Sequence, residues 1–172
     1  MVLEIKLEKA PAVIFLFKSI NATEDIQMHT EDFISIMIHQ TDLKLTSFIK
    51  EELREFNLTP EQNLIMMLLW EEDGRTQNDI ARRLQKDKTN IARMAVQLEK
   101  KQFVRRVSAV EDQRVMQLFV TEDGRQLQEK VRPKAERFNA AVTKGISAEE
   151  LKALEQTLAK ISRNVSESLR EE

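Results

Sequence analysis

The spacing of apolar residues changes near residue 33. Upstream of this point, Leu3, Ile5 and Leu7 alternate with charged residues, and a period of two is typical of a β-strand. A second β-capable run, AVIFLF, follows after a proline. These patterns predict that residues 1–32 form an N-terminal extension that is strand-like or mobile, since an isolated hairpin is only marginally stable by itself.

From residue 33 onward the apolar positions recur at helical spacing, and they predict a helix over residues 33–57. The stretch LTPEQ then has the signals of a helix start. Thr59 is placed to cap the helix, Pro60 to occupy its first position and Gln62 to close a capping box. The following NLIMMLLW is apolar on nearly every side, so we expect this helix to be buried at the centre of the domain.

Two more helices are predicted in the middle of the chain. Thr76 and Asp79 form a capping pair for a short helix that ends near Leu84, and a brief polar turn leads to a helix over residues 88–101. One face of the later helix is apolar, with Ile91, Ala95 and Leu98 at helical spacing. The opposite face carries Thr89, Asn90, Arg93 and Gln97.

Two β-leaning runs, residues 103–107 and 115–121, follow these helices with a charged segment between them. Asp112 and Arg114 are two residues apart, so on a strand they would project from the same face, where the acid would hold the guanidinium in place. Two short helices followed by a β-ribbon predict a winged helix-turn-helix. The outer face of the second helix suits the major groove of DNA.

The C-terminal part of the chain is predicted to be helical. One helix runs from about Thr121 to Thr143, bent at Pro133, and Ser147 with Glu150 begins another through a capping box. Apolar residues of the last helix recur at steps of three, four and seven, a pattern typical of a seam between helices. They are Leu151, Leu154, Leu158, Ile161, Val165 and Leu169. The fold class is therefore mainly α with a small β-wing.

Charge is segregated along the chain, although the formal net charge is only −2. Residues 75–114 hold 11 Lys and Arg against 5 Asp and Glu, and acidic residues predominate in the rest. A basic stretch of this kind is the pattern of a phosphate-binding face. We expect Lys86, Lys88, Arg82 and Arg83, which surround the second helix of the motif, to neutralise phosphates.

From about residue 36 to 169 the chain resembles the MarR family of bacterial winged-helix transcription regulators. The matching stretches are LTPEQNLIMMLLW, TQNDIARRLQKDKTNIARMAVQLEKK, DQR and VTEDGR, and their joint spacing is specific. The resemblance implies a homodimer that presents two recognition helices to a pseudo-palindromic operator in double-stranded DNA. It also implies repression that a small-molecule effector relieves. Residues 33–57 and 122–172 would then be dimerisation helices, and 58–121 the DNA-binding lobe.

The family pattern also assigns roles to single residues. Thr89, Asn90 and Arg93 match positions that face bases and phosphates, Arg114 matches a wing arginine that enters the minor groove, and Asp112 matches the acid that steadies it. One departure concerns the end of the recognition helix, where the family commonly has Gly and this chain has Gln102. Gln in a left-handed conformation costs of the order of 1 kcal/mol unless another cap forms.

Other classes of function find little support. The chain has no Cys, which excludes thiolate zinc sites and fits a reducing cytoplasm. No apolar run is long enough for a membrane helix. The sequence also contains no catalytic constellation and no cofactor motif. The histidines, His29 and His39, do not have the spacing of a metal site, and we expect His39 to be partly buried. Trp70 is read as core packing rather than as pocket lining. The alternative function is a winged-helix protein-interaction module that does not bind DNA.

Overall fold

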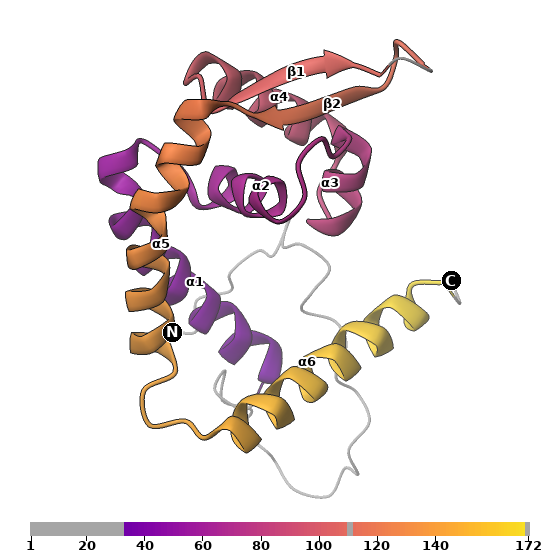
Figure 1. The fold of residues 1–172 in the computed structure, drawn as a ribbon. Helices are drawn as coiled ribbons and strands as arrows, with labels where there is room; N and C mark the ends of the chain where they lie inside the picture. The colour runs from indigo at the N-terminus through magenta and orange to yellow at the C-terminus, as the bar shows by residue number, and fades with distance from the viewer. Residues whose placement is uncertain (1–32, 110–111, 171–172) are drawn as a thin grey trace, which may run out of the picture. The chain divides into compact units, whose positions relative to one another are not determined.

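The computed structural model describes residues 33–109 and 112–170, and the extension predicted for residues 1–32 lies outside this part. The elements are α1 (Ile34–Leu53), the 3₁₀ helix η3 (Arg54–Phe56), α2 (Pro60–Glu71), α3 (Gln77–Arg83), α4 (Lys88–Lys100), β1 (Val104–Ser108), β2 (Met116–Val120), α5 (Glu122–Val142) and α6 (Ala148–Ser168) (Figure 1). This order confirms a mainly helical chain with a two-stranded wing. The chain divides into units 1–39 and 40–172, and the contacts described below lie within the second.

Most helices begin where the capping residues predicted. Capping boxes form between Thr59 and Gln62 at the start of α2 and between Ser147 and Glu150 at the start of α6. Such caps satisfy backbone N–H groups that have no partner within the helix, and each stabilises by about 1 kcal/mol. At α3, Thr76 accepts the expected bond from the backbone of Asp79. The Asp79 side chain does not complete a box, because it binds arginines instead.

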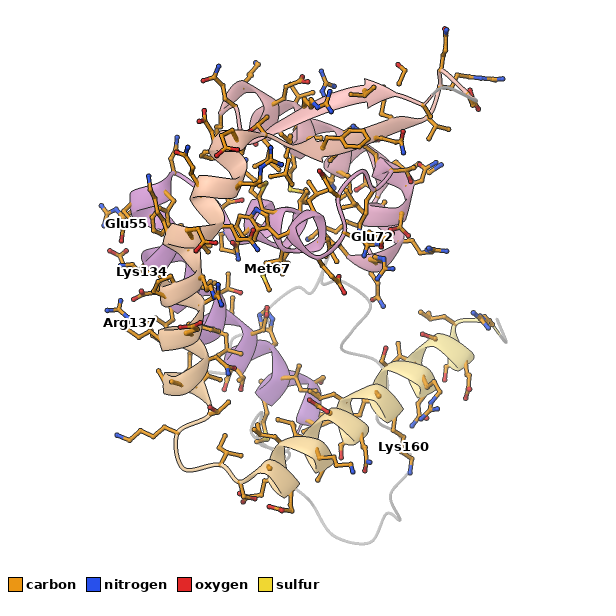
Figure 2. All side chains as sticks on the ribbon, in the orientation of Figure 1. Glu55, Met67, Glu72, Lys134, Arg137 and Lys160 are labelled. Carbon is orange, nitrogen blue, oxygen red and sulfur yellow. The ribbon has the colours of Figure 1, made fainter. Side chains whose placement is uncertain are left out.

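The core of the winged helix-turn-helix lobe forms where α2, α4 and the wing meet. Its fully buried residues include Ile65, Met66, Leu69, Ile91, Leu98 and Leu118. Helix α2 lies in this core, as expected of a helix that is apolar on nearly every side, but one of its flanks is exposed. Leu64 and Met67 are 42% and 50% exposed, and Figure 2 labels Met67 on this flank. The periodicity of an all-apolar helix cannot show which side the rest of the chain covers.

The wing is an antiparallel ribbon in which Val104 pairs with Val120 and Ser108 with Met116. Backbone hydrogen bonds join Leu118 to the loop before α3, with Gly74 N–H donating to its carbonyl at 3.0 Å. Gly74 has φ +77, and a Cβ there would lie 2.8 Å from the ring of Phe119. Position 74 therefore needs a residue that tolerates a positive φ and has no Cβ, and glycine there lets β2 lie against the helix-turn-helix.

Helix α5 leaves the wing and packs along the end of α1 and η3. Its first turn lies tightly against the wing, since a Cβ on Gly124 would be 2.2 Å from the carbonyl oxygen of Phe103. Further along, Lys134 Nζ lies 2.6 Å from Glu55, and both residues are labelled in Figure 2. Arg137 pairs with Glu52. These contacts connect the winged helix-turn-helix lobe to the end of α1 through one continuous helix, α5.

Candidate DNA-binding interface

Helix α4 has the two faces that its sequence predicted. Ile91, Ala95 and Leu98 are buried, and they fix the helix to the core of the lobe. The opposite face is exposed and carries Thr89, Asn90, Arg93 and Gln97. Because the buried face sets the rotation of the helix, the polar side chains are presented together on one surface.

A chain of hydrogen bonds orders the first turn of this surface. Asp87 is the N-cap of α4 and accepts the backbone N–H of Asn90 at 2.8 Å, and the Asn90 amide donates to its other oxygen. The Arg93 guanidinium donates to Oδ1 of Asn90 at 2.9 Å. The Asn90 backbone N–H holds the pKa of the Asp87 carboxyl below its ordinary value.

Asp87 therefore holds Asn90, and Asn90 holds one edge of the Arg93 guanidinium. Sequence reasoning assigned contacts to Asn90 and Arg93 but gave Asp87 no part. The signal was present, since Asp three residues before Asn90 and directly before a helix is a preferred N-cap.

The arginines at α3 form an ion-pair cluster around Asp79, in which the Arg82 side chain is still 80% exposed. The Asp79 carboxylate accepts from Arg82 at 2.6 Å, from Arg75 at 2.9 Å and from Arg83 at 3.1 Å. Hydrogen bonds from Arg82 and then Arg75 lower the pKa of Asp79 to about 2. Arg82 and Arg83 were expected to neutralise phosphates, but in this structure both are paired with Asp79.

Arg75 belongs to the basic stretch by sequence and yet is only 7% exposed. Its Nε donates to the carbonyl of Leu68 at 3.1 Å, and Glu72 lies 2.9 Å from its guanidinium. The residue joins the end of α2 to α3, so its charge stabilises the lobe and is not offered to solvent. The basic stretch thus contributes fewer free cations than its composition indicates.

An open groove of about 530 Å³ runs between the start of α2 and the outer face of α4. Its lining includes Lys86, Asn90, Arg93 and Gln97, with Glu61 as its acidic member. Lys88, at the first position of α4, is also exposed. The structure thus brings Lys86, Asn90 and Arg93, three of the predicted contact residues, to one concave surface.

The wing residues lie differently from the prediction. Asp112 and Arg114 are in the turn before β2, so they do not share the face of a strand. Oδ1 of Asp112 accepts the backbone N–H of Arg114 at 2.9 Å and lies 3.5 Å from its Nε. The acid therefore mainly shapes the turn. The Arg114 side chain is 94% exposed, and such a pair contributes little energy in water.

Gln102 occupies the position where the family commonly has Gly, and its φ is +63. Gln102 thus adopts the left-handed conformation that a Gly would adopt at the end of α4. Arg105 on β1, which sequence reasoning did not single out, lies 5.0 Å from the centre of the Phe119 ring. This cation–π contact holds an exposed arginine on the wing.

Two other expectations concern single residues. The Trp70 indole donates to the carbonyl of Gly124 at 3.0 Å and packs against the core, so the core interpretation holds. His39 is exposed, and the expectation of partial burial was wrong. His29 lies outside the described residues, which contain no group of metal-binding side chains and no helix able to span a membrane.

Comparison with known proteins identifies this arrangement. A family model described as the MarR family matches residues 58–116. The chain is 25% identical over 121 residues to YybA, an HTH-type transcriptional regulator of Bacillus subtilis (strain 168), covering 70% of this chain and 81% of YybA. It is 28% identical over 103 residues to the organic hydroperoxide resistance transcriptional regulator of the same strain, covering 60% and 70% of the two chains.

Solved structures agree. The transcriptional regulator SlyA superposes with a TM-score of 0.71 and 27% identity, over 78% of this chain and 95% of SlyA. Residues 58–116 match the MarR family, and the chain shares the fold of such regulators. The fold is also that of MepR of S. aureus, solved as a DNA complex, with a TM-score of 0.72 and 24% identity over 77% of this chain and 98% of MepR. This chain is a winged helix-turn-helix DNA-binding transcriptional regulator similar to the MarR family.

Proposed function

We propose that this protein is a homodimeric repressor that binds a pseudo-palindromic operator and is released by a small-molecule effector. The observation that carries the DNA-binding part is the chain from Asp87 through Asn90 to Arg93 on the exposed face of α4. Short polar side chains beside an oriented guanidinium suit base edges in the major groove, whereas Lys86 and Lys88 suit phosphates. Arg114, exposed on the wing, is proposed to enter the minor groove.

Dimerisation is supported by the apolar stripe on α6. Leu154, Leu158 and Val165 are 50%, 42% and 55% exposed in the single chain. Apolar surface of this extent favours burial at about 25 cal/mol per Å², and a second copy of the helix offers a matching stripe. A two-fold dimer would carry two α4 helices, which accounts for a pseudo-palindromic operator.

An open pocket supports the effector part of the proposal. It has a volume of about 320 Å³ and lies between η3 and the first half of α5, lined by Phe56, Phe103 and Leu127 together with Glu55, Asp123, Gln126 and Lys130. This volume suits a small organic molecule. Because α5 continues directly from the wing, a ligand bound in this pocket could shift α5 and with it the DNA-binding lobe. The chain has no Cys, so we do not propose thiol oxidation as the trigger.

The test begins with selection of binding sequences from a randomised duplex library by the full-length protein. We expect an inverted repeat whose half-sites are about one helical turn apart, and an affinity that falls steeply with salt. Arg93→Ala is expected to lower affinity and relax sequence preference, by about 1–3 kcal/mol if the arginine reads a base. Arg114→Ala should also weaken binding, whereas the matched control Arg132→Ala on α5 should not.

Transcription in vitro from a promoter that carries the selected sequence would establish whether the bound protein represses. Enrichment of no sequence, or binding that does not depend on salt, would contradict the proposal and favour a winged-helix module for protein contacts. Activation of the promoter would refute the repressor assignment and leave the DNA contacts intact.

A further inference from the structure

A polar chain connects the interior of the lobe to the outer face of α4 through Gln62, which is 2% exposed. Its Oε1 accepts the backbone N–H of Thr59 at 3.3 Å and the ammonium of Lys101 at 2.8 Å. Its Nε2 donates to Oε1 of Gln97 at 2.9 Å. Lys101 also donates to the carbonyl of Asn57.

The orientation of both amides follows from the chemistry of these partners. A backbone N–H and an ammonium can only donate, so they require the oxygen of Gln62 and turn its NH₂ group toward Gln97. Gln97 must then offer its oxygen to Gln62. Its own NH₂ group makes no hydrogen bond within residues 33–109 and 112–170, and the side chain lines the groove beside Lys86 and Arg93.

We propose that Gln97 is a further DNA-contacting residue that acts only as a donor, and that Gln62, held by Lys101, is the positioning residue that sets this polarity. The inference rests on the proposed function, in which the outer face of α4 meets DNA. A free Gln recognises adenine by donating and accepting at once. The Gln97 oxygen accepts from Gln62 and therefore faces the interior, which leaves the NH₂ group as the part that can reach a phosphate oxygen or a base acceptor such as N7 or O6 of guanine.

The polarity can be reversed by one substitution. In Gln62→Glu the carboxylate still accepts from Thr59 and Lys101, but it has no N–H for Gln97. Gln97 would then rotate to donate inward, and its oxygen would face the DNA. In Gln97→Met the polar group is removed at an exposed site, with no loss of core packing, and Gln156→Met on α6 is the matched control.

The experiment measures binding of each full-length variant to the duplex that the wild-type protein selects. We expect Gln97→Met to bind about 3- to 10-fold more weakly, as for loss of one hydrogen bond, and Gln156→Met to bind as the wild type does. Gln62→Glu should weaken binding at least as much, but it should add almost nothing in the Gln97→Met background. Thermal melts of each variant report whether the fold is intact.

The source of the acceptor is resolved by modified DNA. If a phosphate is bound, a neutral methylphosphonate at one position should abolish the difference between the wild type and Gln97→Met. If a base is bound, 7-deazaguanine at one position should abolish it instead. Equal binding by the wild type and Gln97→Met overturns the donor role, and a full effect of Gln62→Glu in the Gln97→Met background overturns the positioning role. Selection of no sequence by the wild type would overturn the proposed function itself.

Discussion

Gln102 is a position where a single substitution should stabilise the protein. Its φ of +63 lies in the left-handed region, where the Cβ of an L-residue is crowded by the backbone. The position closes α4 and begins the wing, since the Gln102 N–H donates to Glu99 and its carbonyl accepts from Thr121. Both bonds use backbone atoms, so Gln102→Gly retains them and relieves the crowding.

The expected gain is a difference between two terms. Relief of the left-handed conformation contributes about 1–2 kcal/mol. Gly also loses more conformational freedom on folding than other residues, which offsets about 0.5–1 kcal/mol. Because the Gln102 side chain is exposed, its removal costs little packing. The net gain is about 0.5–1 kcal/mol, which for a chain of 172 residues raises Tm by about 1–4 °C.

The assay is thermal and urea unfolding followed by circular dichroism at one fixed protein concentration, because Tm of an oligomer depends on concentration. Gln85→Gly, at φ +50, should also stabilise. Gln156→Gly replaces the same residue type inside α6 and should destabilise by about 1 kcal/mol. A loss of stability in Gln102→Gly, or the same sign in all three variants, would refute the argument from backbone conformation.

Three further predictions follow from particular contacts. Gly124→Ala should lower the free energy of unfolding, measured in urea, by about 1–3 kcal/mol, because the new Cβ would meet a backbone oxygen at 2.2 Å. In the control Gly145→Ala the Cβ meets no atom within 4 Å, so only the smaller effect of the φ of +78 is expected. The pKa of Asp79 is lowered to about 2, so the stability that its ionised carboxylate contributes is complete above the ordinary value of 3.8 and is lost as pH falls toward 2. The difference in urea midpoint between the wild type and Asp79→Asn should therefore shrink over that range. A difference that stays constant would contradict the ion-pair account. Leu158→Arg should shift the protein from dimer to monomer in sedimentation velocity with little change in the helical signal, and an unchanged sedimentation coefficient would argue against α6 as the dimer seam.

Local signals accounted for much of the helix-turn-helix. Thr59, Asp87 and Ser147 cap helices through contacts within three residues, and such short-range chemistry can be read directly from the chain. The apolar spacing of α4 likewise defined its buried face and therefore its exposed one. The departure at Gln102 is also local, since α4 ends in a left-handed residue whose backbone N–H binds Glu99, three residues earlier, whatever side chain it carries.

Contacts between distant segments were not predictable in this way. Gln62 was correctly placed in a capping box, but its bond to Gln97, 35 residues away, depends on how α2 packs against α4. The burial of Arg75 was equally hidden, because composition counts a buried arginine and a free one alike.

The sequence by itself determined the order of elements, their caps and the polar face of α4, because these depend on neighbours within a turn or two of the chain. Only the tertiary structure decided which polar side chains of distant segments meet. Lys101 orients Gln62, Gln62 binds Gln97, and Arg75 is buried between elements. The physical reason is that hydrogen bonds and ion pairs act over about 3 Å, so partners are set by packing.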